Sequence, residues 1–229
     1  MYPSIVVIIP AFDEEKSIGS VIRDIPKDVV SEIIVIDNNS KDQTGARAMA
    51  AGATVLIEKE QGYGAACLNG IRYLALKSTK PDIVVFMDAD YSDFGEQLLD
   101  VVRPIIENNY EMVIGSRALG RREKGSMTFP QIFGNRLATL LLRWIYKTSY
   151  TDLGPFRAIR YDTLILLGMR DRNYGWTVEM QLRAAKQKIK VCEVPVDYRV
   201  RIGVSKVSGT LKGTFMAGYK ILTTIFKYI

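Results

Sequence analysis

Two aspartates separated by a single residue are the side chains in this chain best suited to holding a metal ion. Asp88 and Asp90 follow the apolar run at residues 83–87, with Ala89 between them. At the end of a strand the chain turns, so both carboxylates can converge on one cation. Mg²⁺ or Mn²⁺ held in this way keeps open positions for the oxygens of a pyrophosphate and neutralises charge as the bond to the leaving phosphate breaks. A turn whose aspartates cap the next helix would give the same pattern.

Polar clusters also follow two earlier apolar runs. Residues 10–15 read Pro-Ala-Phe-Asp-Glu-Glu, and residues 37–40 read Asp-Asn-Asn-Ser. A nucleotide needs an aromatic or apolar wall for its base and hydrogen-bond acceptors for its base and ribose. Phe12, Glu14 and Asp37 supply these groups. Helix capping by the acidic and serine side chains of the same clusters is an alternative role for them.

The composition of the chain narrows the chemistry further. Its 229 residues include no histidine, which excludes His-dependent catalytic triads and imidazole zinc sites. Any metal must be held by oxygens, and any proton transfer must use Asp, Glu, Lys, Tyr or Cys. The net charge of +6 suits an anionic partner: a nucleotide, a nucleic acid or membrane headgroups. Cys67 and Cys192 form no ligand pattern and are typical of intracellular thiols.

Apolar runs that alternate with helical segments must position these residues. The near-continuous apolar strands predict an α/β fold with a parallel sheet buried on both faces. Active sites of such sheets lie at the carboxyl ends of the strands, where all three polar clusters fall. The first run lacks the basic flank and cleavage site of a signal peptide, so we expect a strand there. The predicted strands are residues 4–10, 32–37, 55–58, 83–87 and 112–116, and the predicted helices are residues 13–25, 42–51, 65–76 and 96–109.

The pattern changes after residue 116. Residues 120–126 are polar and basic and predict a mobile loop, whereas residues 136–147 predict a strongly apolar helix. A second helix is expected at residues 175–188. Residues 190–200 predict an edge strand, because Pro195 cannot donate to a neighbouring strand.

The last segment has the pattern of an amphipathic helix. Its lysines fall together on a face about 150° from the apolar face, at about 100° per residue. They interrupt the segment too often for a transmembrane span. The helix could lie flat on a bilayer with its lysines toward anionic headgroups, or pack on the domain's own core or a partner subunit. The apolar face holds Leu211, Phe215, Gly218, Leu222, Ile225 and Ile229, and the basic face holds Lys212, Lys220 and Lys227.

Taken in order, these motifs resemble a family 2 glycosyltransferase with the GT-A fold, which is a Rossmann-like, mostly parallel sheet flanked by helices. Three later segments narrow the resemblance to dolichol- or polyprenol-phosphate mannose and glucose synthases. The match runs from about residue 5 to residue 209. It rests on residues 10–15, 35–42, the Gly-x-Gly at 62–64, residues 87–90, 115–117, 152–157, 193–196 and 205–209.

The resemblance implies roles for individual residues. It places the metal at Asp88 and Asp90 and makes Asp90, Arg117 and Lys206 the catalytic residues. A cation beside the diphosphate would stabilise developing negative charge. Arg201 is a weaker match to the same basic role. The implied contacts of the nucleotide sugar are Pro10, Ala11, Phe12, Glu14, Ile36, Asp37, Asp88, Ala89, Arg117, Arg201 and Lys206.

The chain departs from the family's pattern at several positions. Phe12 stands where the family often has Tyr, and Asp13 where it often has Asn, so stacking survives but a hydroxyl contact is lost. The Gly-Asn pair at 134–135 lacks an arginine that mannose synthases often place before it. Candidate substitutes for binding the lipid phosphate are Arg122, Arg136 and Arg143. The Gly-x-Gly at 62–64 is equally typical of a turn before a helix.

The acceptor is predicted from a missing base. Transferases with a sugar hydroxyl as nucleophile often use the Asp of a Glu-Asp pair on a late helix, but here that pair reads Glu179-Met180. A phosphate monoester is already ionised at neutral pH and needs no base. The sequence therefore favours a phosphate acceptor. Glu179 is expected to position a ligand or to pair with a cation.

These observations predict an inverting, Mg²⁺- or Mn²⁺-dependent enzyme that moves a hexose from GDP-mannose or UDP-glucose to a polyprenyl or dolichyl phosphate. The basic loop at 121–124 and the helix at 136–147 would receive the lipid. Residues 1–209 would form the transferase domain and residues 210–229 the C-terminal helix. We expect a peripheral enzyme on the cytoplasmic face of a membrane, possible anchorage by a membrane subunit, and no nucleic-acid partner. The alternatives are a sugar-hydroxyl transferase of polysaccharide or glycolipid synthesis and a non-catalytic nucleotide-sugar-binding subunit.

Overall fold

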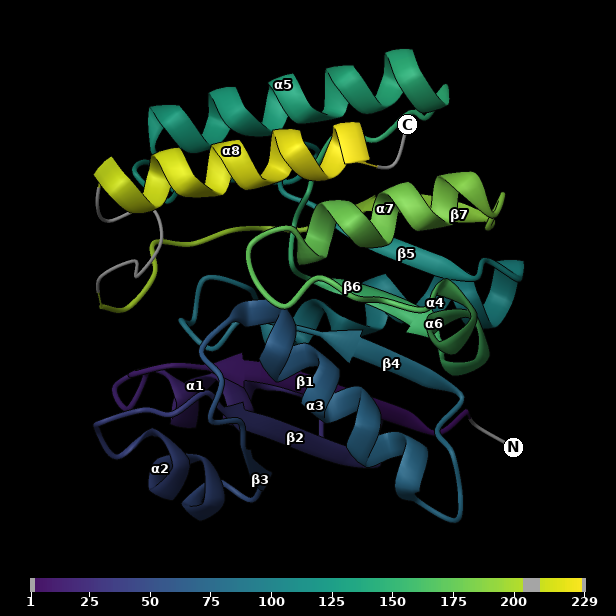
Figure 1. The fold of residues 1–229 in the computed structure, drawn as a ribbon. Coiled ribbons are helices and arrows are strands. Elements are labelled where there is room, and N and C mark those ends of the chain that lie inside the picture. The colour runs from purple at the N-terminus through teal and green to yellow at the C-terminus, as the bar shows by residue number, and fades with distance from the viewer. Residues whose placement is uncertain (1–2, 204–210, 228–229) are drawn as a thin grey trace.

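A computed structural model describes residues 3–203 and 211–227 of the chain. A seven-stranded sheet runs through it in the order β3-β2-β1-β4-β6-β5-β7. Every neighbouring pair is parallel except the two pairs that include β6, which is antiparallel to both β4 and β5. In Figure 1 the strands are stacked from β3 at the bottom to β7 near the top, and two long helices, α5 and α8, lie above that end of the sheet.

The strands and helices alternate along most of the chain. The strands are β1 (Ile5–Ala11), β2 (Glu32–Asp37), β3 (Thr54–Ile57), β4 (Ile83–Phe86), β5 (Met112–Ser116), β6 (Arg157–Arg160) and β7 (Val191–Pro195). The α-helices are α1 (Ile18–Asp24), α2 (Thr44–Ala50), α3 (Tyr63–Leu76), α4 (Leu98–Asn108), α5 (Phe129–Tyr146), α6 (Tyr161–Leu167), α7 (Trp176–Lys186) and α8 (Leu211–Lys227), with a 3₁₀ turn, η1 (Gly95–Gln97), before α4.

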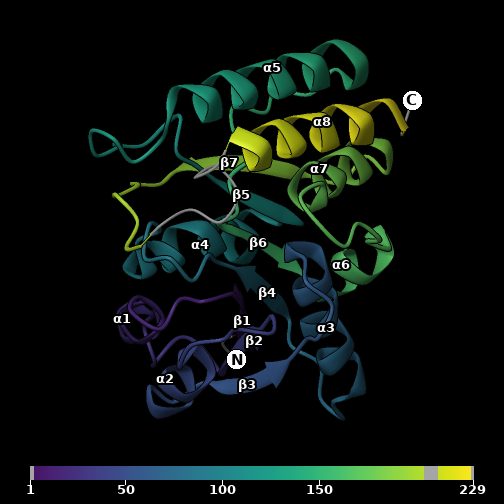
Figure 2. The ribbon, with the colours of Figure 1, turned by 60° about the vertical axis from the view of Figure 1, so that its left-hand side comes forward.

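Helices cover both faces of the sheet, and each face has its own apolar core. Because successive side chains of a strand point to opposite faces, Val6 and Ile8 of β1 belong to one core, whereas Ile5, Val7 and Ile9 belong to the other. The first core is completed by α3, α5, α6, α7 and α8, and the second by α1, α2 and α4. Figure 2 shows these two groups of helices on opposite sides of the strands. The predicted α/β class with a doubly covered, mostly parallel sheet is confirmed.

Most predicted elements are present, with shifted ends. All five predicted strands occur, and the predicted edge strand is β7, which ends at Pro195. The first helix begins at Ile18, not at residue 13, because the backbone N–H of Glu14 donates to Thr44 Oγ1 (2.8 Å) and Asp13 adopts a left-handed φ of 51°. Helix α5 begins at Phe129, seven residues before the predicted start at residue 136.

Strand β6 and helix α6 were not predicted. Arginines stand at both ends of β6, so its four residues show no apolar run. Arg157 is nevertheless fully buried, because its guanidinium donates to the carbonyls of Leu153, Gly154 and Thr177. Burial lowers the pKa of Arg157 to about 10, which still leaves it charged at neutral pH.

The C-terminal helix α8 packs against α5 and α7. Ile225 and Thr224 are buried, and Lys220 Nζ lies 3.0 Å from Asp171 Oδ2, so one predicted headgroup lysine is held in an internal salt bridge. In its described part α8 is therefore a component of the domain's core. Within residues 3–203 and 211–227, no helix is long and apolar enough to cross a membrane.

Candidate active site

The carboxyl ends of β1 and β4 and the start of α3 surround a cavity of about 540 Å³, which we call the first cavity. It brings together most of the residues predicted to bind a nucleotide sugar. An aromatic ring, carboxylates, a guanidinium and amide groups face one space, as a nucleotide requires. The lining residues are Pro10, Ala11, Phe12, Glu14, Asn38, Gln61, Gly62, Tyr63, Asp88, Ala89, Asp90, Asn173, Tyr174 and Arg201.

Three carboxylates gather after β4, and we call Asp88, Asp90 and Asp93 the aspartate cluster. Burial raises the pKa of Asp88 well above its ordinary value, and the charges of Asp90 and Asp93 raise it further. Burial, together with the charge of Asp90, raises the pKa of Asp93 to about 7. The cluster therefore concentrates negative charge in a place that water does not stabilise, which favours a cation as its partner.

Arg201 supplies one such cation. Its guanidinium lies between two carboxylates, with Nη1 3.1 Å from Asp90 Oδ2 and Nη2 2.7 Å from Glu14 Oε1. These two contacts join a predicted metal ligand to a predicted nucleotide contact. Arg201, which was only a weaker match in the sequence, thus contacts both residues and lines the first cavity.

The aspartate cluster also fits a divalent metal ion. The buried oxygens Asp88 Oδ1 and Asp93 Oδ1 have no hydrogen-bond partner among the described residues. Asp88 and Asp90 offer the hard oxygen ligands that Mg²⁺ and Mn²⁺ prefer. Among the described residues, however, no three His, Cys, Asp or Glu side chains are arranged so that all three could hold one ion, and this includes the three aspartates of the cluster. A metal at Asp88 and Asp90 would therefore take its remaining ligands from water and from the diphosphate of a donor.

The Gly-x-Gly segment shapes the first cavity through close packing. A Cβ atom at Gly62 or Gly64 would collide with the backbone carbonyl oxygen of Arg172 or Asp171, and Gly62 adopts a φ of 154°. Only glycine lets the loop after Met169 approach the start of α3 so closely. This approach brings Asn173 and Tyr174 into the cavity. No motif pointed to these two residues, because their position depends on packing between distant segments.

The second polar cluster contributes through Asn38. Its Nδ2 donates to the carbonyls of Glu58 (3.1 Å) and Glu60 (2.6 Å), and its Oδ1 accepts from Gly62 N (2.7 Å). Ile36 is buried, and Asp37 accepts a hydrogen bond from the backbone of the next turn; neither lines the first cavity.

Arg117 lies beside the aspartate cluster in a fixed position. Its Nε and Nη2 donate to the two oxygens of Asp152, at 2.8 and 2.7 Å, and its guanidinium lies 5.0 Å from the centre of the Tyr198 ring. Burial opposes the charge of both partners, but Arg117 lowers the pKa of Asp152 below its ordinary value, and Asp152 raises the pKa of Arg117. A guanidinium has five N–H donors, and Asp152 takes two of them.

Arg117 faces a second cavity, of about 320 Å³, next to the first. The two cavities share Tyr63, Asp88, Asp90, Tyr174 and Arg201. Among the described residues of its wall, Asp88 and Asp90 are the only carboxylates. The rest of the wall comes largely from α5, α8 and the loops beside them: Arg117, Met127, Pro130, Gln131, Gly134, Asn135, Leu153, Pro155, Trp176, Thr177, Tyr198, Gly218 and Ile221.

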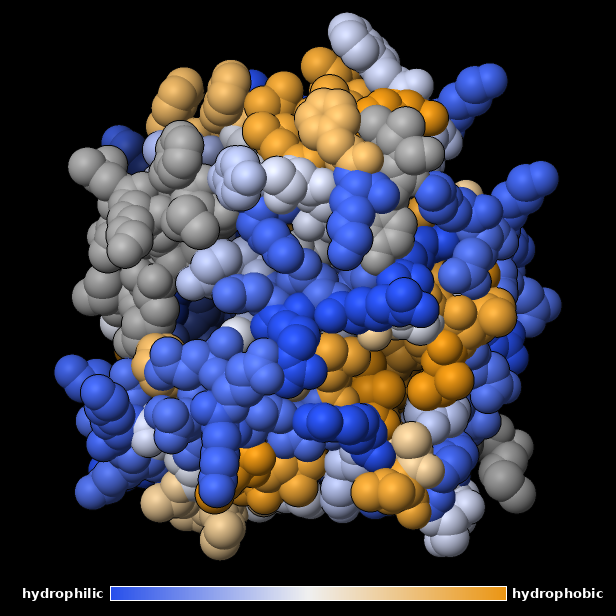
Figure 3. Space-filling model, viewed as in Figure 1, coloured by the Kyte–Doolittle hydropathy of each residue, from blue (hydrophilic) through white to orange (hydrophobic). Residues whose placement is uncertain are grey.

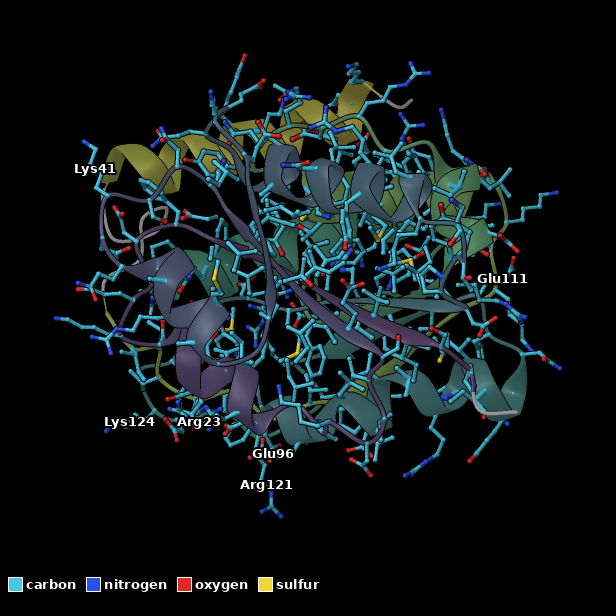
Figure 4. The ribbon with its side chains drawn as sticks, turned by 90° about the horizontal axis from the view of Figure 1, so that it is seen from below. Arg23, Lys41, Glu96, Glu111, Arg121 and Lys124 are labelled. Carbon is cyan, nitrogen blue, oxygen red and sulfur yellow. The ribbon has the colours of Figure 1, made fainter. Side chains whose placement is uncertain are left out.

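The three arginines predicted to bind a lipid phosphate do not line either cavity. Arg122 Nη1 donates to Met127 Sδ (3.5 Å), and Arg136 and Arg143 are exposed on α5. In the loop before α5, the side chain of Arg121 projects away from the body of the molecule in Figure 4. The structure instead brings Arg117 and Arg201 to the second cavity. Lys206 lies outside the described residues.

Glu179 pairs with a cation, as expected for one of its two predicted roles. It is buried in α7, where it accepts from Arg183 Nε (2.8 Å) and from the backbone N–H groups of Arg170 (3.0 Å) and Asp171 (2.6 Å). Glu179 lines neither cavity. It therefore fixes the start of the loop that carries Tyr174, and a role as general base has no geometric support.

Comparison with known proteins gives consistent matches over most of the chain. A family model described as glycosyl transferase family 2 matches residues 6–167. An uncharacterized glycosyltransferase of Mycobacterium tuberculosis is 33% identical over 219 residues, covering 93% of this chain and 94% of that protein. The dolichyl-phosphate hexose transferase of Haloferax volcanii is 30% identical over 214 residues, covering 90% and 87%. In structure, the chain resembles glucosyl-3-phosphoglycerate synthase from M. tuberculosis in complex with Mn²⁺, UDP and phosphoglyceric acid, with a TM-score of 0.76, 22% identity, and coverage of 99% of this chain and 78% of that one.

Proposed function

The chain belongs to glycosyltransferase family 2 and has its GT-A fold, and from this membership and the two joined cavities we propose that it transfers a hexose from a nucleotide diphosphate sugar to a polyprenyl or dolichyl phosphate. The relative from H. volcanii, whose name is dolichyl-phosphate hexose transferase, supports the lipid acceptor. We place the reaction on the cytoplasmic face of a membrane, with the protein bound peripherally.

The first cavity is the proposed donor site. Phe12 offers a ring for the base, and Glu14 offers a carboxylate in the same cavity. The residues that would hold a divalent metal are Asp88 and Asp90. When bound, Mg²⁺ or Mn²⁺ would supply positive charge to the leaving diphosphate. Arg201, now paired with Glu14 and Asp90, would add a second cation beside the same diphosphate.

The residues in the wall of the second cavity are the observation on which the proposed phosphate acceptor rests. Its two guanidiniums, Arg117 and Arg201, suit an anionic headgroup, and apolar side chains such as Met127 and Ile221 suit the chain attached to it. A sugar hydroxyl would need a base to remove its proton. Asp88 and Asp90 are the only carboxylates in the described wall, and both belong to the proposed metal site. An acceptor that is already ionised avoids this need.

The wall that the two cavities share supports a reaction at the boundary between them. Tyr63, Tyr174 and Arg201 border both spaces, so the anomeric carbon of a donor in the first cavity would lie where the second cavity begins. An acceptor phosphate held by Arg117 would attack this carbon from the side opposite the leaving diphosphate. The configuration of the sugar would therefore invert.

Transfer of label into lipid tests this function. The protein is incubated with Mn²⁺, polyprenyl phosphate and one radiolabelled nucleotide sugar at a time, including GDP-mannose and UDP-glucose. We expect one donor to send label into the organic phase, and excess EDTA to abolish the transfer. Phosphoglyceric acid and free polyprenol serve as alternative acceptors. Label that enters either of these but never polyprenyl phosphate would overturn the proposal.

A further inference from the structure

Helix α5 exposes large apolar side chains to solvent. Phe129, Phe133, Leu140 and Trp144 are 79%, 58%, 42% and 74% exposed, respectively. We call these four residues the outer stripe. Phe129 and Phe133 stack with ring centres 6.4 Å apart. At about 100° per residue, the four side chains project within about 60° of one another, over a length of about 22 Å. Figure 3 shows hydrophobic residues gathered along the top of the molecule, over α5.

The opposite side of α5 packs against the rest of the domain. Ala138 and Leu142 are buried in the core, and Gln131, Gly134 and Asn135 line the second cavity. The helix therefore separates this cavity from the outer stripe by its own width, about 10 Å. A chain that leaves the second cavity past α5 would emerge beside the stripe.

Basic side chains flank the outer stripe on one side. Arg136 and Arg143 are exposed on α5, and Lys147 is exposed at its C-terminal end. At about 100° per residue they project up to about 60° to one side of Leu140. A helix with an apolar stripe and a basic flank matches a bilayer surface, where the apolar residues enter the acyl boundary and the cations reach anionic headgroups.

We propose that the outer stripe of α5 is the surface that rests on an anionic bilayer. The choice of a bilayer rests in part on the proposed lipid acceptor, because the second cavity adjoins the inner side of the same helix. A second copy of this chain is a poorer occupant. In a twofold dimer the stripe would face itself and bring the cationic side chains Arg136, Arg143 and Lys147 of both copies to one interface.

Of the two roles that the sequence allowed for α8, lying on a bilayer or packing on the domain's core, this assignment leaves α8 the second. Ile225 is buried against the core and Lys220 is paired with Asp171, so these α8 residues are not available to a bilayer. The outer stripe of α5 has no such cover among the described residues.

Tryptophan fluorescence measures contact of the outer stripe directly. The chain has two tryptophans; Trp144 belongs to the stripe, and Trp176 is 1% exposed in the core. Vesicles of phosphatidylcholine with phosphatidylglycerol, without polyprenyl phosphate or donor, are added to the intact protein. We expect the emission of Trp144 to shift to the blue and brominated acyl chains to quench it, with Trp176 unchanged. Salt should weaken binding, since charges are screened over about 8 Å at physiological ionic strength.

Variants distinguish binding through the outer stripe from nonspecific binding of the protein to vesicles. Phe133→Ser should lower the partition into these vesicles on the order of tenfold, because one large apolar side chain is lost from the contact. Arg136→Gln with Arg143→Gln should remove the preference for phosphatidylglycerol over phosphatidylcholine alone. The matched control is Leu76→Ser on α3, which removes a side chain that is 86% exposed far from α5 and should leave the partition unchanged.

Two results would overturn the proposal. One is an unshifted Trp144 emission at all lipid concentrations. The other is a blue shift that grows with protein concentration in the absence of vesicles, which would assign the stripe to self-association. Both readouts need no catalysis. Failure of lipid binding with intact transfer to a short, water-soluble polyprenyl phosphate would refute the bilayer surface alone, whereas binding without transfer would refute the proposed function alone.

Discussion

At the scale of single residues, the site is built from charged side chains, most of which form ion pairs beside the two cavities. Asp90 and Glu14 share Arg201, and Asp152 holds Arg117, while Asp88 and Asp93 keep a buried oxygen each without a hydrogen-bond partner among the described residues. Buried carboxylates without a partner lower the stability of the folded state, and a cation that binds to them raises it again. The proposed donor complex supplies that cation.

The stability of the metal-free protein should reveal this cost at Asp93. Its pKa in the folded protein is about 7, above the ordinary 3.8, so the folded state binds this proton more tightly than the unfolded state. The resulting penalty therefore grows as pH rises through this window and is complete above about pH 7. In EDTA, Asp93→Asn should raise the unfolding free energy at about pH 8 by a few kcal/mol, and by less at about pH 5. An equal gain at both pH values, measured by urea denaturation, would contradict the raised pKa.

Glu179 gives a second test at this scale, because a general base and a structural carboxylate respond differently to amidation. Glu179→Gln weakens the contact to Arg183 and should cost about 1–3 kcal/mol of stability. Activity should fall by less than the 10² to 10⁴ typical of a lost base. The acidic limb of the pH–rate profile should persist, because the titrating group would be the proposed acceptor phosphate, which has a second pKa of about 6. A folded variant with almost no activity and no acidic limb would identify Glu179 as the base.

At the scale of elements, sequence patterns predict the strands and helices that bury apolar runs. They miss the elements whose position depends on packing between segments that are distant in the sequence. Strands β1, β2 and β4 are nearly continuous in Val and Ile, and β3 and β5 each hold a shorter apolar run, so all five were predictable. Strand β6 was not, because Arg157 is buried through carbonyl contacts that no local pattern encodes. The early start of α5 could have been found: Thr128 and Gln131 form a capping box.

The same distinction holds for the candidate site. Residues after strand ends, such as Phe12, Glu14 and Asp90, were predictable because parallel strands end at one edge of the sheet. Asn173 and Tyr174 were not, since they reach the first cavity only through the packing of their loop against Gly62 and Gly64. Arg117 was predicted from the family resemblance, but its contact with Asp152, 35 positions away along the chain, was not.

Helix α8 offers a test at the scale of elements with two neighbouring residues. Ile225 is fully buried, whereas Phe226 is 59% exposed. Ile225→Ala should therefore lower the unfolding free energy by about 2–5 kcal/mol, as expected for a truncation that leaves a cavity. Phe226→Ala, the matched control, should change it by about 0.5 kcal/mol or less. Equal small effects in thermal denaturation would show that α8 is not part of the folded core.

At the scale of the whole molecule, the two cavities and the outer stripe lie next to one another in space. The first cavity opens at the strand ends, the second cavity adjoins it under α5, and the outer stripe covers the far side of that helix. A water-soluble donor and a membrane-bound acceptor could thus approach the shared wall from different sides. The net charge of +6 agrees with anionic partners on both sides.

The bond made in the product tests the central claim most directly. The donor identified by the label-transfer assay is prepared with ¹³C at its anomeric carbon and turned over with polyprenyl phosphate. If the acceptor phosphate is the nucleophile, NMR of the extracted lipid should show that carbon coupled to the single phosphorus of the acceptor, with a configuration opposite to that in the donor. An anomeric carbon bonded to a hydroxyl oxygen, with no coupling to phosphorus, would contradict a phosphate acceptor, and a retained configuration would contradict attack from the second cavity.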